Sequence, residues 1–262
     1  MHRYLLPMLA ITVFAPQAHA QRQAQRDAFT WSQKIPEGRW IRVRNLNGEI
    51  HVESTSGDKV EVTATKRYRR SDPETVRFEV QKVGPNQQDV LICALWTDRS
   101  SCDQHGYESH NVRNNDVKVE FRVLVPKGVK VGVATVNGAV DVDGVTSEVD
   151  ASTVNGGVDV NSTGGPVNAS TVNGDVNARM GKFTLDNDVN FSTVNGSVIA
   201  DFVGELDADV ELSTVNGRFY TDYQVTVSGR LDPRHLRAKI GKGGPRVRLT
   251  TVNGSVELRR RG

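Results

Sequence analysis

Apolar and polar residues alternate in short runs along most of the chain. Between Phe29 and Val125 these runs include Trp40–Val43 and Lys59–Thr65. Residues that favour turns separate the runs, as in Pro36–Gly38. A period of two bounded by Gly, Pro, Asn and Asp is typical of β-strands. Leu and Ala, which favour helices, are sparse after residue 30. The pattern therefore predicts an all-β protein.

One motif, Thr-Val-Asn-Gly, is repeated six times, and Asn45-Leu46-Asn47-Gly48 is a seventh, degenerate copy. When the copies are aligned on Asn, the residues six and four positions before it and three positions after it are apolar in every copy. The positions between them are mostly polar. Each copy thus predicts one half-buried strand, an Asn-Gly corner and a second half-buried strand. The predicted corner residues are Asn47, Gly48, Asn137, Gly138, Asn155, Gly156, Asn173, Gly174, Asn195, Gly196, Asn216, Gly217, Asn253 and Gly254.

Two architectures are compatible with this repeat. In a meander of hairpins, Asn-Gly is a two-residue turn. In a β-solenoid it is a corner, and equivalent residues of successive coils stack at about 4.8 Å. The Asn-to-Asn spacings of 18, 18, 22, 21 and 37 residues leave room for two strands and two turns per unit. We favour the solenoid, because it also explains the repeated Thr and Val. Each Asn amide then bonds to the one above, and inward Thr and Val pack on their own kind.

The ends of such a stack are open to further strands. We expect the N-terminal section, with Trp31 and Trp40, to close one end. The charged Arg259–Arg261 is expected to discourage strand addition at the other end. The 37-residue spacing carries an insertion of roughly Asp222–Pro245. The predicted organisation is a signal peptide at 1–20, a disordered linker at 21–28, an N-terminal β-strand section at 29–129, the repeat β-solenoid at 130–258 and a basic tail at 259–262.

The first twenty residues have the features of a secretory signal. A basic start is followed by the apolar run Leu5–Ala15 and by an A-x-A cleavage site at Ala18–Ala20. The run is too short to cross a bilayer. We therefore expect an exported mature chain without a transmembrane segment, in the periplasm, on the outer surface or outside the cell. In an oxidising compartment the two cysteines, Cys93 and Cys102, predict a disulfide that closes a polar loop.

The strongest family signals lie around the repeats. Val123–Gly128 leads into Val131–Gly138, and Gly241–Gly244 is followed by Val247–Leu258. These stretches resemble the bacterial family of "putative adhesins" once catalogued as a domain of unknown function, DUF4097, with T-x-N-G units. The resemblance runs from about Ile35 to Leu258. It implies a cell-envelope or surface protein and supplies no catalytic residues. The Cys93–Cys102 loop and the insertion look peculiar to this chain.

Three polar groups are candidates for binding, each weighed against an ordinary solvated surface. The stretch Cys102–His110 offers imidazole and carboxylate ligands for a metal, although Cys102 is better used in the disulfide. Aspartates on the polar strand faces offer oxygen ligands for Ca²⁺: Asp141, Asp143, Asp150, Asp159 and Asp175. Basic residues offer patches for anionic polysaccharide or lipid: Lys66, Arg67, Arg69, Arg70, Arg230, Arg234, His235, Arg237 and Lys239. The solvated surface is favoured in all three cases, so no metal or cofactor is assigned.

The formal net charge of +2 argues against a general nucleic-acid binder. The chain lacks the G-x-S-x-G and H-E-x-x-H motifs, and no catalytic residue is assigned. The sequence favours an exported, non-catalytic envelope protein that acts as an adhesion or scaffolding surface. Its expected partner is surface polysaccharide or another envelope protein. Two alternatives stay open: a carbohydrate-active enzyme on a β-solenoid, and an envelope-stress partner that binds through a strand edge.

Overall fold

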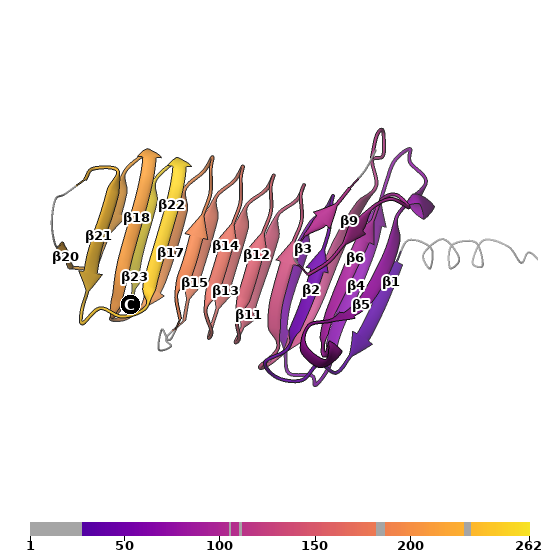
Figure 1. Cartoon of the computed structure of the whole chain (residues 1–262), viewed down its shortest axis with the longest axis horizontal. Helices are drawn as coiled ribbons and strands as arrows, with labels where there is room; N and C mark the ends of the chain where they lie inside the picture. Colours follow the sequence, from indigo (N-terminus) through magenta and orange to yellow (C-terminus); the bar gives the residue numbers. More distant parts are fainter. Residues whose placement is uncertain (1–27, 105, 110–111, 182–186, 228–231) are drawn as a thin grey trace, which may run out of the picture.

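The computed structural model describes residues 28–104, 106–109, 112–181, 187–227 and 232–262. These residues form two long β-sheets that face each other along an elongated stack (Figure 1). Successive copies of the repeat contribute one strand to each sheet. The solenoid prediction is therefore confirmed, and the hairpin meander is wrong for the repeat. The predicted signal peptide lies outside the described residues.

Sheet A has ten strands. Their spatial order is β1 (Ala28–Gln33), β4 (Val60–Arg67), β9 (Lys118–Pro126), β3 (Ile50–Thr55), β11 (Val140–Val145), β13 (Val158–Ser162), β15 (Val176–Met180), β17 (Val198–Val203), β23 (Val256–Arg261) and β19 (Phe219–Thr221). From β3 to β19 neighbouring strands run parallel, whereas β1 and β4 are antiparallel additions.

Sheet B has eleven strands. Their spatial order is β20 (Val225–Val227), β21 (His235–Ile240), β18 (Ala208–Asn216), β22 (Arg246–Asn253), β16 (Val189–Ser192), β14 (Val167–Ser170), β12 (Val149–Ser152), β10 (Lys130–Ala134), β2 (Trp40–Arg44), β6 (Asp89–Leu95) and β5 (Arg77–Val83). Two short strands, β7 (Ser101–Cys102) and β8 (Tyr107–Glu108), form a separate pair. Two 3-10 turns, η1 (Pro73–Thr75) and η2 (Pro85–Gln87), complete the described elements.

The core lies between the two sheets and is built mainly from valines in register. Val131 pairs with Val149, and Val149 pairs with Val167 on the next coil. On sheet A, Val140 and Val158 do the same. These side chains are fully buried. A single coil buries too few side chains to fold alone, so the stability of each coil depends on its neighbours.

The corners carry two ladders of hydrogen bonds along one long edge of the stack. The Asn155 amide donates to Asn137 Oδ1 at 2.8 Å, and the Asn173 amide donates to Asn155 Oδ1 at 2.9 Å. The same bond links the later corners, out to Asn216 on Asn253. The buried Thr171 hydroxyl donates to the carbonyl of Gly156 at 2.8 Å. The Thr and the Asn of the motif thus both form hydrogen bonds between neighbouring coils.

The corner glycine is required by close approach between coils. A Cβ on Gly174 would overlap the carbonyl oxygen of Gly156 in the coil below, and its φ of +152° is one that other residues rarely adopt. The valine of the motif is different. The prediction that it packs inward is wrong, because five of the six copies expose it by 37–49%: Val154, Val172, Val194, Val215 and Val252. The corner turns directly after the inward Thr, which points the next side chain outward.

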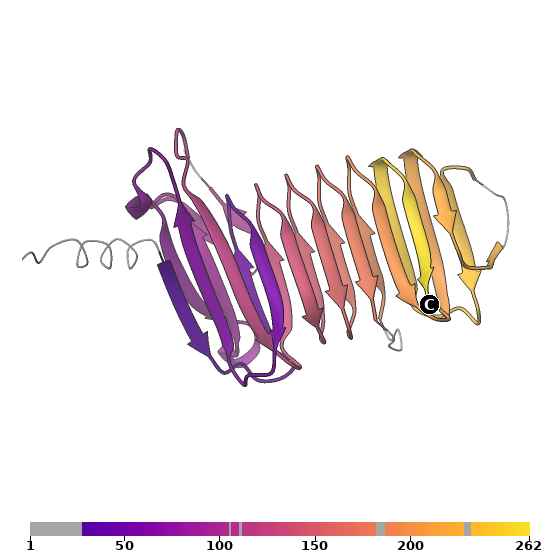
Figure 2. The ribbon, with the colours of Figure 1, turned by 180° about the vertical axis from the view of Figure 1, so that it is seen from behind.

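The last two copies are stacked in the reverse of their sequence order. Strand β22 lies between β16 and β18, so the corner at Asn253 sits between those at Asn195 and Asn216. Figures 1 and 2 show the C-terminus short of the tip, which is formed by β21 and β20. The prediction that Arg259–Arg261 lies at this end and discourages strand addition there is therefore wrong. These residues continue β23 inside sheet A rather than forming a tail.

The N-terminal section closes the other end. Its β2 and β3 extend the solenoid, since Asn47 bridges to Asn137. Beyond them, Phe29 of β1 stacks on Phe78 of β5 with ring centroids 4.7 Å apart, which joins the two sheets at this end. The predicted disulfide between Cys93 and Cys102 is present. With Leu91 and Leu95 it forms a small second core on the outer side of β6.

Candidate binding site on the outer face of sheet B

On the outer face of sheet B, the coils of β12, β14 and β16 carry short polar side chains, whereas the degenerate copy on β2 does not. Three positions before the motif Asn, most copies carry a small residue, such as Ser152 on β12 and Ser170 on β14. The degenerate copy carries Arg44 there, on β2. Five positions before Asn, the regular coils carry residues such as Asn168, while β2 carries Arg42. Two guanidinium groups therefore project from one strand, beside coils with short polar side chains.

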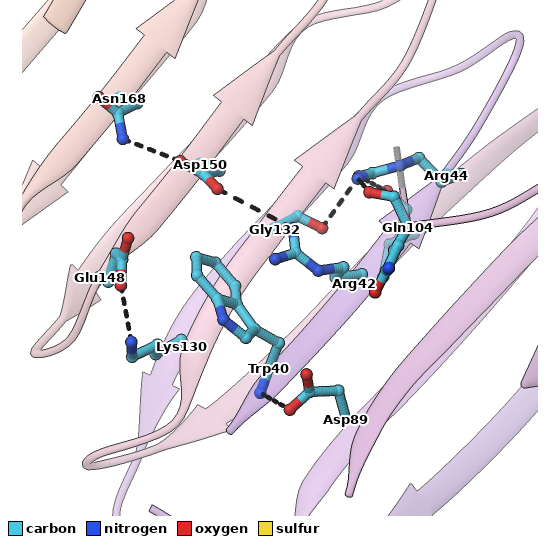
Figure 3. Close-up of polar contacts among 11 residues, drawn as sticks. Trp40, Arg42, Arg44, Asp89, Gln104, Lys130, Gly132, Glu148, Asp150 and Asn168 are labelled. Carbon is cyan, nitrogen blue, oxygen red and sulfur yellow. Dashed lines mark hydrogen bonds and ion pairs between the residues drawn. The ribbon is translucent and has the colours of Figure 1, made fainter. Parts of the chain in front are cut away.

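A glycine on the neighbouring strand makes room for one of them. Gly132 of β10 is the partner of Arg42 in the register, and a Cβ there would lie 2.7 Å from Arg42 Nη1. Without that Cβ, the Arg42 side chain extends across β10 towards β12. Its Nη1 lies 3.9 Å from Asp150 Oδ2 (Figure 3). The other oxygen of Asp150 accepts from the Asn168 amide at 3.0 Å.

The second guanidinium, that of Arg44, is buried and contacts backbone carbonyls. It donates to Gln104 O at 3.0 Å, to Val43 O at 3.3 Å and to Gly132 O at 3.4 Å (Figure 3). Burial, followed by the charge of Arg42, lowers the pKa of Arg44 to about 10. The group still carries its charge at neutral pH. No carboxylate of the described residues forms an ion pair with it, which is uncommon for a buried arginine.

Trp40 borders this group on the same face of β2. The Arg42 guanidinium lies 4.0 Å from the centroid of its ring, and Lys130 Nζ lies 5.5 Å from it. Lys130 also pairs with Glu148 at 2.8 Å. The backbone N–H of Trp40 donates to the buried Asp89 at 3.0 Å, which holds the start of β2 in place. The indole therefore fixes the direction of Arg42 through a cation–π contact.

Together these side chains surround a surface cavity of about 400 Å³. Its lining is Arg42, Arg44, Gln104, Val133, Asp150 and Ser152. One wall, with Gln104, comes from the segment that the Cys93–Cys102 disulfide holds against β6. The opposite wall belongs to β12, two strands away, or about 9–10 Å. The cavity thus has a cationic side and a side that offers a carboxylate and a hydroxyl.

A family model described as Toastrack DUF4097 matches residues 106–259. The chain belongs to the Toastrack family. The family resemblance seen in the sequence is therefore confirmed. The matched range includes Gly132 and Asp150 of the cavity but not Trp40, Arg42 or Arg44.

Two solved structures also match this Toastrack chain. A putative cell adhesion protein from Clostridium sporogenes is 12% identical, with a TM-score of 0.45 and coverage of 89% of this chain and 100% of that chain. A putative adhesin from Bacteroides fragilis is 12% identical, with a TM-score of 0.38 and coverage of 89% and 97%. A comparison with curated proteins finds no match.

The aspartates proposed for Ca²⁺ lie on two different faces of the Toastrack stack. Asp150 is on sheet B, whereas Asp141, Asp143 and Asp159 line a cavity on sheet A. They are engaged by neighbouring side chains: Asn161 donates to Asp143 at 2.7 Å, and His51 Nδ1 lies 3.2 Å from Asp141. In the described part of the chain, no three His, Cys, Asp or Glu residues are arranged to hold a metal. In the Cys102–His110 candidate, both histidines fall outside the described residues.

The basic residues proposed as patches are separated by the length of the stack. Lys66 and Arg67 belong to β4 at the N-terminal end, and His235, Arg237 and Lys239 belong to β21 at the other end (Figure 1). Lys66 is buried and donates to Pro73 O at 2.8 Å, so it is not part of an exposed patch. Arg230 lies outside the described residues.

Arg42 and Arg44 were missed as site residues. The signal that could have found them was their departure from the small residues at the same outward positions of the other copies.

Proposed function

We propose that this Toastrack protein is an exported, non-catalytic binding protein of the bacterial cell envelope, of the adhesion type. The observation that carries the proposal is the cavity on the outer face of sheet B, whose lining is suited to holding a polar ligand. It contains two guanidinium groups, a carboxylate and a hydroxyl. The long ladder of coils serves as a rigid support that presents this face to a surface polymer. The family membership and the apolar start of the chain also support export.

A binding role is favoured over turnover by the surroundings of the titratable groups. The two histidines in the described part of the chain, His51 and His235, contact carboxylates of Glu53, Asp141 and Glu211. Neither has a hydrogen bond to a Ser, Thr or Cys side chain among the described residues, which a nucleophile and base would require. In that same part of the chain, no helix is long and apolar enough to cross a membrane.

The test is retention of purified envelope polysaccharides by the immobilised protein, combined with size analysis of each polysaccharide after long incubation. We expect saturable retention with unchanged chain length. Shortening of any polysaccharide that is abolished by heat inactivation would contradict the non-catalytic role. Absence of retention for every envelope polysaccharide would contradict the binding role. Fractionation of cells that express the full chain tests export, and a cytoplasmic mature protein would contradict it.

A further inference from the structure

Resting on the proposed function, we propose that the cavity between β2 and β12 binds one residue of an acidic sugar. The sugar carboxylate would be held by Arg42 and Arg44, and its ring hydroxyls by Asp150 and Ser152. Each wall retains polar groups that can bind a ligand.

The cationic wall has unused donors. A guanidinium has five N–H groups. Arg44 donates three hydrogen bonds, which leaves two of its N–H groups for a ligand. Two of those three bonds are long, at 3.3 and 3.4 Å. Arg42 lies 3.9 Å from Asp150, which is beyond hydrogen-bond distance. The charges of Arg42 and Arg44 disfavour each other, Asp150 and Asp103 offset part of this repulsion, and an anion between the two guanidinium groups would lower it further.

The opposite wall excludes a simple anion and favours a ligand with hydroxyl groups. Asp150 Oδ2 accepts no hydrogen bond from the described residues, while Oδ1 is engaged by Asn168. A sulfate ion has no hydrogen-bond donor for this carboxylate, and a phosphate ion has at most one or two, while the negative charge of either ion is repelled by Asp150. A sugar acid carries both the anionic group for the arginines and hydroxyl donors for Asp150. The cavity volume of about 400 Å³ accommodates one sugar ring beside the Arg42 guanidinium.

The floor of the site is open. Gly132 and Ala134 of β10 leave the strip between the walls without large side chains. On the regular coils, the position of Arg44 is occupied by residues such as Ser170 and Ser192, which have no charge. The disulfide keeps Gln104 against Arg44, so the oxidised loop is part of the binding site.

The experiment is calorimetric titration of the oxidised protein with oligogalacturonate, with its methyl ester and with inorganic phosphate. The ester keeps the hydroxyls and removes the charge. We expect saturable binding of the acid, and binding of the ester and of phosphate weaker by about tenfold or more. Arg42→Gln and Arg44→Gln should each weaken binding of the acid by about tenfold. Arg248→Gln is the matched control, because it removes an exposed arginine from the same outward position of β22.

Gly132→Ala provides a second test that leaves every charge in place. The added Cβ displaces Arg42, a flexible side chain, so the fold is retained while affinity for the acid falls several-fold. Thermal melts of each variant identify any that fail to fold. Equal binding of acid and ester, equal binding of phosphate, or unchanged affinity in Arg42→Gln and Gly132→Ala would overturn the assignment. If the protein then still retained another envelope polysaccharide, the proposed function would stand without the acidic-sugar site. If it retained no polysaccharide, both the acidic-sugar site and the proposed function would be contradicted.

Discussion

The regular coils and the degenerate first coil use the same backbone for different purposes. In the coils from β10 to β17, nearly every repeated side chain contacts its own equivalent above and below, as Asn155 does with Asn137 and Asn173. On β2, the outward residues Arg42 and Arg44 differ from the short polar side chains of β12 and β14, and they contact other strands and the disulfide loop instead. Repetition therefore builds the support, and the chemistry lies where repetition is broken. Four substitutions test this contrast through their effects on stability.

Gly156→Ala should have the largest effect. Its Cβ would overlap the carbonyl of Gly138, so the coils would have to separate. We expect a loss of about 3–5 kcal/mol in the free energy of unfolding, measured by chemical denaturation. The neighbouring Gly157→Ala is the matched control, because its Cβ would make ordinary contacts at 3.5 Å or more. Equal effects of the two changes would show that close approach at the corner is not what requires glycine.

Thr171→Val should have a smaller effect. The variant keeps the shape and burial of the side chain but loses the hydroxyl that donates to Gly156 O. A buried carbonyl left without this donor costs about 1–2 kcal/mol, measured by the same denaturation. Thr171→Ser retains the hydroxyl and should retain that part of the stability. If the Thr171→Val variant is as stable as the unmodified protein, the threonine ladder does not stabilise the stacking of the coils.

Asn173→Ala should cost about 1 kcal/mol. It removes one bond to Asn155 and one from Asn195, but the ladder is exposed and water replaces part of what is lost. The measurement is the shift in melting temperature. Val172→Thr alters the adjacent outward residue and should leave the melting temperature nearly unchanged. An unchanged melting temperature in Asn173→Ala would contradict the stabilising role of the asparagine ladder.

Tyr223→Phe should have the smallest effect, visible only at high pH. Burial raises the pKa of Tyr223 to about 12, and its hydroxyl donates to Gly204 O at 3.2 Å near the tip. Between about pH 10 and 12 the unfolded chain loses this proton while the folded chain keeps it, so stability falls as pH rises. In the Phe variant this fall should be shallower. Burial of Tyr107 acts in the same direction, so some pH dependence remains. If the free energy of unfolding fell with pH equally steeply in both proteins, Tyr223 would not contribute to this pH dependence.

Much of the fold could be predicted because the apolar positions recur with a strict period around each Asn-Gly. That period defines which faces are buried, and it predicted the two facing sheets correctly. The outward direction of Val154 and its equivalents follows from the same period, because Thr153 shares the inward parity and the next residue falls on the opposite face. The stacking order of the last two copies could not be predicted. Any copy of the motif fits beside any other, so the sequence pattern does not distinguish Asn253 from Asn216 as the neighbour of Asn195.

The candidate site was harder to predict than the fold. It depends on Gly132 and Asp150 lying beside Arg42, and on a loop placed by Cys102 more than fifty residues later in the chain. To predict this combination, one needs the stacking register and the path of the disulfide segment over sheet B. The sequence suggests the register but not the path. The two arginines were visible as departures from the repeat, but nothing in the sequence placed Gln104 against them.

The reversed order of the last two copies has a consequence for synthesis. The ribosome delivers β18 before β22, yet β22 is the strand that lies beside β16 in the finished molecule. Both strands carry the same inward pattern, so the unfinished edge of β16 accepts whichever is available first. A chain paused before Arg246 exposes that edge to β18. Truncation at the C-terminus therefore removes an internal strand of the stack instead of its last strand. We expect the tip to reach its final arrangement only after β22 has been synthesised.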